Sequence, residues 1–284
     1  MSDAAKLDAR NVRRRFDRAA ATFDAADFVH AVTRDGLMTR LQPLVVDAAL
    51  VLDLGAATGA ANPLLRKRFK GANVVSLDLS EAMLRKNIGK QRLFSRRPCV
   101  QADARQLPFA EHRFDVVFAN LLLPWIDDPG LVFNEVARVL QKDGVFAFAS
   151  LGPDSLRELD VAWAAVDGHR HVNRFPDMHD IGDALVRAGL RDPVLDVDRL
   201  TVRYDEAGKL FADLTRMGAR NALRDRNRSL VGKGRFRDMI SALENGRGEF
   251  RFDLELVYGH CWGGGRREPA DYRIDASTIA RRRP

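Results

Sequence analysis

The sequence has few cysteines and no long hydrophobic run, and both absences exclude whole classes of protein. Its two cysteines, Cys99 and Cys261, give neither a metal-binding spacing nor a disulfide framework, which is typical of a reducing compartment. No stretch of about 18 apolar residues is present, so we expect no transmembrane helix. The N-terminus lacks the apolar core of a secretion signal. These absences predict a cytoplasmic protein that has no membrane partner.

The chain also lacks an excess of acidic residues. It carries 46 Lys and Arg against 39 Asp and Glu among 284 residues, so its net charge is +7. A basic surface favours an acidic partner, such as nucleic acid, anionic lipid or an acidic protein. The aromatic-rich basic stretches of nucleic-acid grooves are absent from the sequence, which disfavours a nucleic-acid partner.

Short apolar runs alternate with helical patterns up to residue 150. We expect strands at 49–55, 73–80, 98–103, 113–120 and 143–150. This alternation predicts an α/β fold with a doubly wound, Rossmann-like sheet that is mostly parallel and has helices on both faces. Further along we expect helices at 153–166, 177–188, 206–221 and 233–245, a strand at 193–204, and an antiparallel last strand at 249–262.

These elements predict one domain over residues 1–262. It consists of N-terminal helices at 1–44, a ligand-binding core at 45–150, a helical cap with the sixth strand at 151–248, and the last strand at 249–262. The remaining residues, 263–284, are rich in arginine and polar side chains, and this composition predicts a flexible basic tail.

The turn after the first predicted strand lacks one glycine of a dinucleotide-binding loop. The sequence there is DLGAATG, residues 53–59, whereas a dinucleotide site needs G-x-G-x-x-G. Polar side chains stand at the carboxyl ends of four successive strands instead, namely Asp53, Asp78, Asp103 and Asn120. The carboxyl ends of parallel strands meet at one edge of the sheet, so these side chains predict a ligand site there.

These residues resemble the class I S-adenosylmethionine-dependent methyltransferases over positions 45–150. The resemblance implies that the glycine turn approaches the methionine part of the cofactor, that Asp78 accepts hydrogen bonds from the ribose and that Asp103 contacts the adenine. The implied cofactor-binding residues are Asp53, Gly55, Ala57, Gly59, Asp78, Leu79, Asp103, Ala104, Asn120 and Leu121. Ala57 stands where the superfamily usually has glycine, so its methyl group could crowd the cofactor.

Segments outside the core resemble the malonyl-acyl-carrier-protein O-methyltransferases of biotin synthesis. They are RRFDRAAATFDAA (14–26), LGPDSLRELDVAW (151–163), HVNRFPDMHDIGDALVRAGLRDPVLD (171–196), LTRMGARNA (214–222) and VYGHCW (257–262). The resemblance implies methylation of the free carboxylate of a malonyl thioester, which hides the charge so that fatty-acid enzymes can extend the chain toward pimelate. It also implies an acidic acyl carrier protein as the partner, and we expect this protein to dock on the arginines at 13–18.

A carboxylate acceptor is ionised at neutral pH and needs no general base, so we assign no catalytic residue. Arg174 is the first candidate to hold the carboxylate, because its guanidinium can make two parallel bonds to it. Its alternative role is structural, in an ion pair with Asp177 or Asp180. The other expected substrate contacts are His171, Asn173, Arg157, Phe23 and Trp125. The two aromatic residues could equally be core residues. The histidines have irregular spacing, so we expect no metal site.

Other functions remain open from the sequence. The same fold could methylate another small acid, a quinone precursor or a protein. A related branch, the complex I assembly factor implicated in arginine hydroxylation, shares the fold without this methyl transfer, although it lacks the arginine of HVNRF. A third possibility is a binding or assembly protein that has lost turnover. Methylation of nucleic acid is disfavoured, because the sequence has no D/N-P-P-Y tetrad.

Overall fold

The computed structural model describes residues 6–90, 98–224, 226, 232–244 and 248–264. The predicted basic tail at 263–284 lies outside the described residues, apart from its first two positions.

The described residues form a sheet of seven strands whose order is β3-β2-β1-β4-β5-β7-β6. The first five strands along the chain are parallel, whereas β7 is antiparallel to both of its neighbours. The predicted α/β sheet with an antiparallel last strand is therefore confirmed. The strands are β1 (Leu50–Leu54), β2 (Asn73–Asp78), β3 (Cys99–Gln101), β4 (Phe114–Asn120), β5 (Leu140–Leu151), β6 (Arg191–Tyr204) and β7 (Phe250–Trp262).

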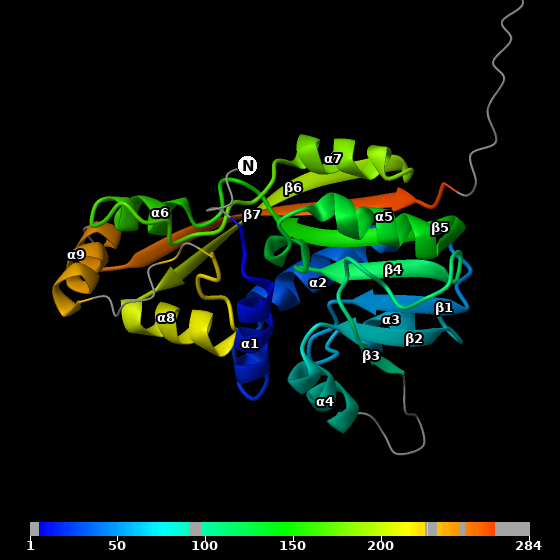
Figure 1. Ribbon diagram of the computed structural model, residues 1–284, viewed down its shortest axis with the longest axis horizontal. Coiled ribbons are helices and arrows are strands. Elements are labelled where there is room, and N and C mark those ends of the chain that lie inside the picture. Colours follow the sequence, from blue (N-terminus) through cyan, green and yellow to red (C-terminus); the bar gives the residue numbers. More distant parts are fainter. Residues whose placement is uncertain (1–5, 91–97, 225, 227–231, 245–247, 265–284) are drawn as a thin grey trace, which may run out of the picture.

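Helices cover both faces of the sheet (Figure 1). On one face, α5 (Pro129–Val139) and α7 (Met178–Arg187) pack on alternate residues of the central strands, including Leu52, Val117 and Phe146. On the other face, α2 (Phe28–Leu41) and α3 (Asn62–Arg68) cover Val51, Val116 and their neighbours. Both faces are apolar because a parallel sheet is buried on both sides.

β6 and β7 extend past the end of β5, and a separate apolar cluster surrounds their extension (Figure 1). Three helices contribute to this cluster, which also includes Phe250 and Phe252 of β7: α6 (Arg157–Ala164), α8 (Ala207–Arg216) and α9 (Lys233–Leu243). This part of the chain lies beside the carboxyl ends of the parallel strands and supplies one wall of the cavity described below.

The N-terminal segment folds over the same edge of the sheet. It contains α1 (Ala9–Ala19) and a short 3-10 helix, η2 (Phe23–Ala25), before α2. The Asp8 side chain caps α1 by accepting a hydrogen bond from the Asn11 N–H, which satisfies a free donor of the first turn. α1 packs against α4 (Glu81–Gly89), and the side chain of Ser80 caps α4 by accepting a hydrogen bond from the Met83 N–H.

Two helices are shorter than the sequence pattern predicts. α8 stops at Arg216 and not at residue 221, because Gly218 has a φ of +76° and the Ala219 N–H turns back to the Leu214 carbonyl at 2.8 Å. α6 begins at Arg157 and not at residue 153, because Leu156 adopts a left-handed φ of 59°. The early end of α8 frees the segment that follows it to pack against α1 and line a cavity.

No helix among the described residues is both long enough and apolar enough to span a membrane.

The close approach of β5 and β7 leaves no room for a side chain at Gly259. This glycine is the register partner of Phe148, and a Cβ there would lie 2.3 Å from the phenyl ring. We expect Gly259→Ala to lower the free energy of unfolding by about 1–3 kcal/mol, because overpacking displaces the ring or the strand. Urea unfolding measures this difference.

Gly208→Ala provides the matched control. Gly208 lies in α8 with no heavy atom within 4 Å of the added Cβ, and alanine favours a helix, so the unfolding midpoint should stay the same or rise slightly. Equal midpoints for both variants would contradict the packing described for β5 and β7.

Candidate functional site

Two cavities open at the carboxyl ends of the parallel strands and share a wall. The empty space is about 720 Å³ in the smaller one and about 1290 Å³ in the larger one, and both volumes include the solvent at the open mouth. Three residues line both cavities: His30 of α2, Leu121 after β4, and Trp125 of the short helix η3 (Leu123–Trp125). A ligand in one cavity is therefore adjacent to a ligand in the other.

The floor of the smaller cavity is the glycine turn after β1, which is bonded to the end of β2. The Ala57 N–H donates to Asp78 Oδ2 at 2.8 Å, and the Ser80 N–H donates to Oδ1 of the same carboxylate at 2.8 Å. Gly55 has a φ of +77°, and a Cβ at this position would lie 3.2 Å from the Leu122 side chain. Glycine therefore suits both the conformation and the close packing of the turn.

Ala57 and Leu121 hold left-handed backbone conformations at this cavity. Their φ angles are 46° and 55°, a region that residues with a Cβ seldom occupy. Backbone strain of this kind concentrates at ligand sites, where the surrounding hydrogen bonds hold it in place. The Leu121 N–H is held by the Ala149 carbonyl at 2.9 Å. Both residues therefore present their backbone to the cavity in a fixed conformation.

Asp53 lies beneath the turn and is 2% exposed. Burial, and after it the neighbouring carboxylate of Asp78, raises the pKa of Asp53 to about 7. Its Oδ2 atom has no hydrogen-bond partner among the described residues. Burial also raises the pKa of Asp78 to about 6, although the N–H groups of Ser80 and Ala57 favour its charged form. The turn therefore holds two carboxyl groups that have not fully lost their protons near neutral pH.

Asp103 and Asn120 complete the row of polar side chains. Arg105 makes a bidentate contact to Asp103, at 3.0 and 2.6 Å, and lowers the pKa of that carboxyl. Asn120 donates from Nδ2 to the His30 carbonyl at 2.9 Å, while its buried Oδ1 has no partner among the described residues. Asn120 thereby ties the end of β4 to α2.

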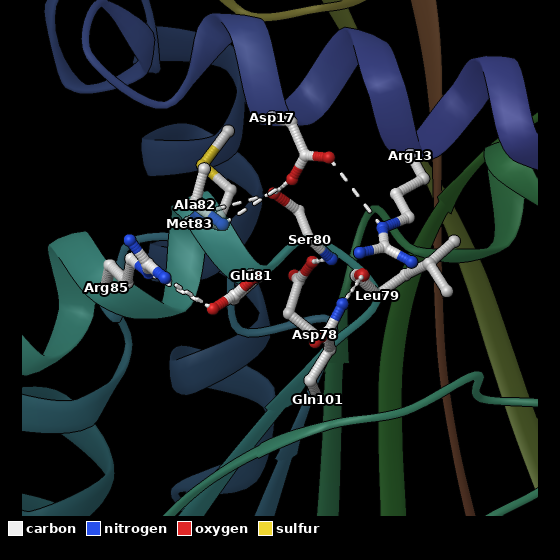
Figure 2. Close-up of polar contacts among 10 residues, drawn as sticks. All are labelled: Arg13, Asp17, Asp78, Leu79, Ser80, Glu81, Ala82, Met83, Arg85 and Gln101. Atoms are coloured by element: carbon white, nitrogen blue, oxygen red, sulfur yellow. Dashed lines mark hydrogen bonds and ion pairs between the residues drawn. The ribbon is translucent and has the colours of Figure 1, made fainter.

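α1 covers the smaller cavity and is fastened to the end of β2 (Figure 2). Asp17 accepts a hydrogen bond from Ser80 Oγ at 2.6 Å, and Ser80 is itself the N-cap of α4. Asp17 also forms an ion pair with Arg13, at 3.7 Å between Nε and Oδ2. Arg13 lines the cavity together with Val12 and Phe16 of the same helix. The N-terminal helix is thus part of the site.

Eight of the ten residues expected to bind the cofactor line the smaller cavity: Gly55, Ala57, Asp78, Leu79, Asp103, Ala104, Asn120 and Leu121. The other two lie behind it. Asp53 is buried below the turn, and a Cβ on Gly59 would lie 2.5 Å from the Asn87 side chain, so Gly59 is needed for packing. Phe23 and Trp125, expected at the substrate, also line this cavity.

The larger cavity is mainly apolar and lies between the cap and the core. Its walls include Phe28, Trp163, Tyr204, Phe211 and Phe252. Two of the expected substrate residues, His171 and Asn173, are among its polar lining. His171 stacks on Trp163 with 3.9 Å between ring centroids, and its Nε2 contacts Asp167 Oδ1 at 3.0 Å. The Oδ1 atom of Asn173 is buried and has no partner among the described residues.

Arg174 and Arg157 are not part of either cavity wall. Both side chains are exposed, and neither makes a hydrogen bond or ion pair within the part of the chain that the structure describes, including the expected pair of Arg174 with Asp177 or Asp180. Asp177 instead caps α7 through the His179 N–H at 2.8 Å. The cationic side chain in the larger cavity is that of Arg220, in the segment freed by the early end of α8.

His30 is a site residue that the sequence pattern did not identify. It lies beside the buried face of α2, and its ring contacts the edge of Phe23 at 5.0 Å between centroids. Its Nδ1 atom is buried without a partner among the described residues. Burial, followed by the charge of Arg34, lowers its pKa to about 4, so the imidazole is neutral at physiological pH. A neutral ring between the two cavities can donate or accept one hydrogen bond at each nitrogen.

The chain matches the family model described as a methyltransferase domain over residues 52–148. Among solved structures it is similar to the YcgJ protein of Bacillus subtilis, with a TM-score of 0.60 and 16% identity over 82% of this chain and 98% of that one. It is also similar to a putative methyltransferase of Bacillus halodurans, with a TM-score of 0.58 and 18% identity over 80% of this chain and 97% of that one. Likeness at this identity establishes the fold.

Curated relatives are much more similar in sequence. The malonyl-[acyl-carrier protein] O-methyltransferase of Laribacter hongkongensis is 44% identical over 272 residues, which is 92% of each chain. The protein of the same name from Methylovorus is 40% identical over 92% of this chain and 91% of its own. That from Halorhodospira halophila is 39% identical over 99% of this chain and 98% of its own. The chain therefore belongs to the malonyl-[acyl-carrier protein] O-methyltransferase family.

Proposed function

We propose that this protein transfers the methyl group of S-adenosylmethionine to the free carboxylate of a malonyl group carried by an acyl carrier protein. The observation that carries the proposal is the shared wall of the two cavities. The smaller cavity has the row of polar residues that suits the cofactor, and the larger one has room and apolar walls for a thioester. Family membership supports the same reaction.

The residues of the smaller cavity fit S-adenosylmethionine. The carboxylate of Asp78 offers acceptor oxygens for a ribose diol, and the glycine turn lets the backbone approach the amino-acid part of the ligand. The buried Oδ1 of Asn120, a residue of the cavity wall, is an acceptor without a donor among the described residues, and the amino groups of a bound cofactor can supply that donor. When bound, S-adenosylmethionine supplies an electrophilic methyl group on a positively charged sulfur.

The protein's own contribution is to position the acceptor and to exclude water. A malonyl carboxylate is already an anion at neutral pH, so no side chain has to remove a proton. Leu121 and Trp125 form an apolar part of the shared wall, and a dry wall strengthens charge interactions and favours an aligned approach. We assign to His30 a hydrogen bond that orients the acceptor at this wall. The role of Arg174 as a carboxylate ligand stays a prediction. Its side chain is exposed and is not part of either cavity wall, although the preceding residue along the chain, Asn173, is.

The proposed reaction is tested by incubating the purified protein with S-adenosylmethionine and malonyl-acyl carrier protein. We expect intact mass spectrometry to show a gain of one methyl group on the carrier, and fragmentation to place that methyl group on the malonyl group. Carrier loaded with an acetyl group, which has no free carboxylate, is the control. Tight cofactor binding without a mass gain would refute the reaction and favour a different acceptor.

Cofactor affinity should depend on pH through the buried acids. The pKa values of about 7 for Asp53 and about 6 for Asp78 mean that lowering the pH protonates the Asp78 acceptor and also removes the negative charge of Asp53 beneath the turn, which attracts the positively charged cofactor. We expect the dissociation constant for S-adenosylmethionine to rise about tenfold or more between pH 7.5 and pH 5.5, measured by titration calorimetry.

Asp53→Asn is the control for this pH dependence, because an amide does not titrate in this range. The variant should show a flatter dependence of the dissociation constant on pH than the natural protein. The raised pKa values also predict that the unliganded protein loses stability as the pH rises from about 4 through 7, because these groups ionise more readily in the unfolded chain. An affinity that is independent of pH in the natural protein would contradict the assigned role of the two acids.

Ala57→Gly tests whether the missing glycine weakens the site. In the free protein Ala57 already has its left-handed φ of 46° and its N–H bonded to Asp78, so the turn accommodates the methyl group before any ligand arrives. We therefore expect the dissociation constant for S-adenosylmethionine to change less than about threefold, which corresponds to a change in binding free energy of less than about 1 kcal/mol. A tenfold tightening would instead indicate that the alanine crowds the cofactor.

A further inference from the structure

Arginine side chains from two distant parts of the sequence lie near one another, and one of them, Arg220, lines the larger cavity. Arg15 and Arg18 lie on α1, and Arg220 and Arg226 follow the end of α8. Burial lowers the pKa of Arg15, and the charges of Arg226, Arg220 and Arg18 lower it further, in that order. Arg15 is therefore close enough to the other three to be repelled by their charges, and the four residues are called the arginine cluster below.

Backbone packing places the two segments in contact. A Cβ on Gly218 would lie 3.3 Å from the Ala19 side chain and 3.4 Å from the Arg15 carbonyl oxygen. Thr22 Oγ1 donates to the Arg216 carbonyl at 3.0 Å, and the Asp8 N–H donates to the Ala222 carbonyl at 2.9 Å. The two segments that carry the cluster are thus in contact at the N-cap of α1, in its last turns and just after its end.

The charge of the cluster is not neutralised within the protein. The side chains of Arg15, Arg18 and Arg220 make no hydrogen bond or ion pair with any residue that the structure describes. The acids nearest in sequence are engaged elsewhere: Asp17 bonds to Ser80, and Asp213 pairs with Arg216 at 3.2 Å. Like charges held together on a rigid support destabilise a fold unless an anion binds between them.

The position of Arg220 links the cluster to the thioester cavity. Arg220 is exposed and also lines the larger cavity, beside Met217, Ala219 and Asn221. The cavity beyond it is apolar up to the wall shared with the cofactor cavity. A ligand that enters past Arg220 therefore meets positive charge at the rim and apolar walls inside.

We propose that the arginine cluster binds the phosphate of the pantetheine arm that carries the malonyl thioester, an inference that rests on the proposed function. The arm of an acyl carrier protein consists of a phosphodiester, a chain of amides and methylenes, and the thioester at its end. This order of charge, neutral chain and acyl group matches the order of Arg220, apolar cavity and shared wall. Arginine suits the phosphate, because its guanidinium makes two parallel charge-assisted bonds to phosphate oxygens.

The test compares malonyl-pantetheine, which has no phosphate, with malonyl-phosphopantetheine and malonyl-acyl carrier protein. In the natural protein we expect the KM for malonyl-phosphopantetheine to be about tenfold lower than that for malonyl-pantetheine, a factor that one charge-assisted contact supplies. In Arg220→Gln, and more strongly in Arg15→Gln combined with Arg220→Gln, this difference should disappear. The readout is the ratio of the two KM values within each variant, because Arg220 also lines the larger cavity and its replacement changes the wall that both thioesters contact.

Arg187→Gln is the matched control, since Arg187 is an exposed arginine in the last turn of α7, away from the cavity rim. It should leave all three KM values unchanged. Cofactor affinity, measured by calorimetry, and the circular dichroism spectrum identify a variant that has not folded. If Arg15→Gln fails this check, Arg220→Gln alone carries the test, because its side chain is exposed and bonded to no described residue.

Each alternative outcome overturns a different statement. Equal KM values for the two small thioesters in the natural protein would overturn the phosphate site while leaving the methyl transfer intact. If the arginine variants raise the KM for malonyl-acyl carrier protein but not for malonyl-phosphopantetheine, the phosphate site is overturned. The arginines would then bind acidic side chains of the carrier protein. Failure of the natural protein to methylate any malonyl thioester would refute the proposed function itself.

Discussion

The site depends on one backbone contact, in which the turn after β1 is hydrogen-bonded to the end of β2. The N–H groups of Gly55 and Ala56 both donate to the Leu77 carbonyl, at 2.8 and 3.0 Å, and continue the parallel register in which Leu54 pairs with Leu77. This contact brings the Ala57 N–H onto the Asp78 carboxylate at 2.8 Å. The Asp53 carboxyl group then lies buried beneath the turn. This contact determines three features of the site: the raised pKa values of both acids, the left-handed conformation of Ala57 and the floor of the cofactor cavity.

The second constraint is that two cavities of different character meet at one wall. The smaller cavity is lined by backbone and carboxylates, whereas the larger one is lined mostly by aromatic and aliphatic side chains from the cap, α2 and β7. A methyl transfer between a charged sulfur and a carboxylate needs alignment more than it needs acid-base chemistry. His30, Leu121 and Trp125 are fixed by contacts from separate elements, including the bond from Asn120 and the edge contact of Trp125 with Phe16 at 5.1 Å. The fold therefore supplies the alignment through residues that are far apart in sequence.

The sequence predicts those parts of the site that a local pattern determines. Asp78 and Asn120 are the last residues of β2 and β4, and Asp103 follows β3. Parallel strands bring their ends together, so eight of ten expected cofactor residues lie on the cavity wall. The remainder depends on tertiary contacts that no local pattern contains. His30 reaches the shared wall only because α2 packs beside β4, and Arg220 reaches the cavity only because a left-handed Gly218 ends α8 early. Arg174 illustrates the reverse case, since the residue type suits a carboxylate but its side chain lies outside the cavities.

The most direct test of the shared wall is a crystal structure of the protein with S-adenosylhomocysteine and a malonyl thioester. We expect the ribose hydroxyls to be hydrogen-bonded to Asp78 and the sulfur to be directed toward His30, Leu121 and Trp125. We expect the malonyl carboxylate on the opposite side of these residues, with the thioester chain in the larger cavity. A complex in which the thioester bypasses the larger cavity, or in which the ribose does not contact Asp78, would contradict a shared wall between cofactor and acceptor.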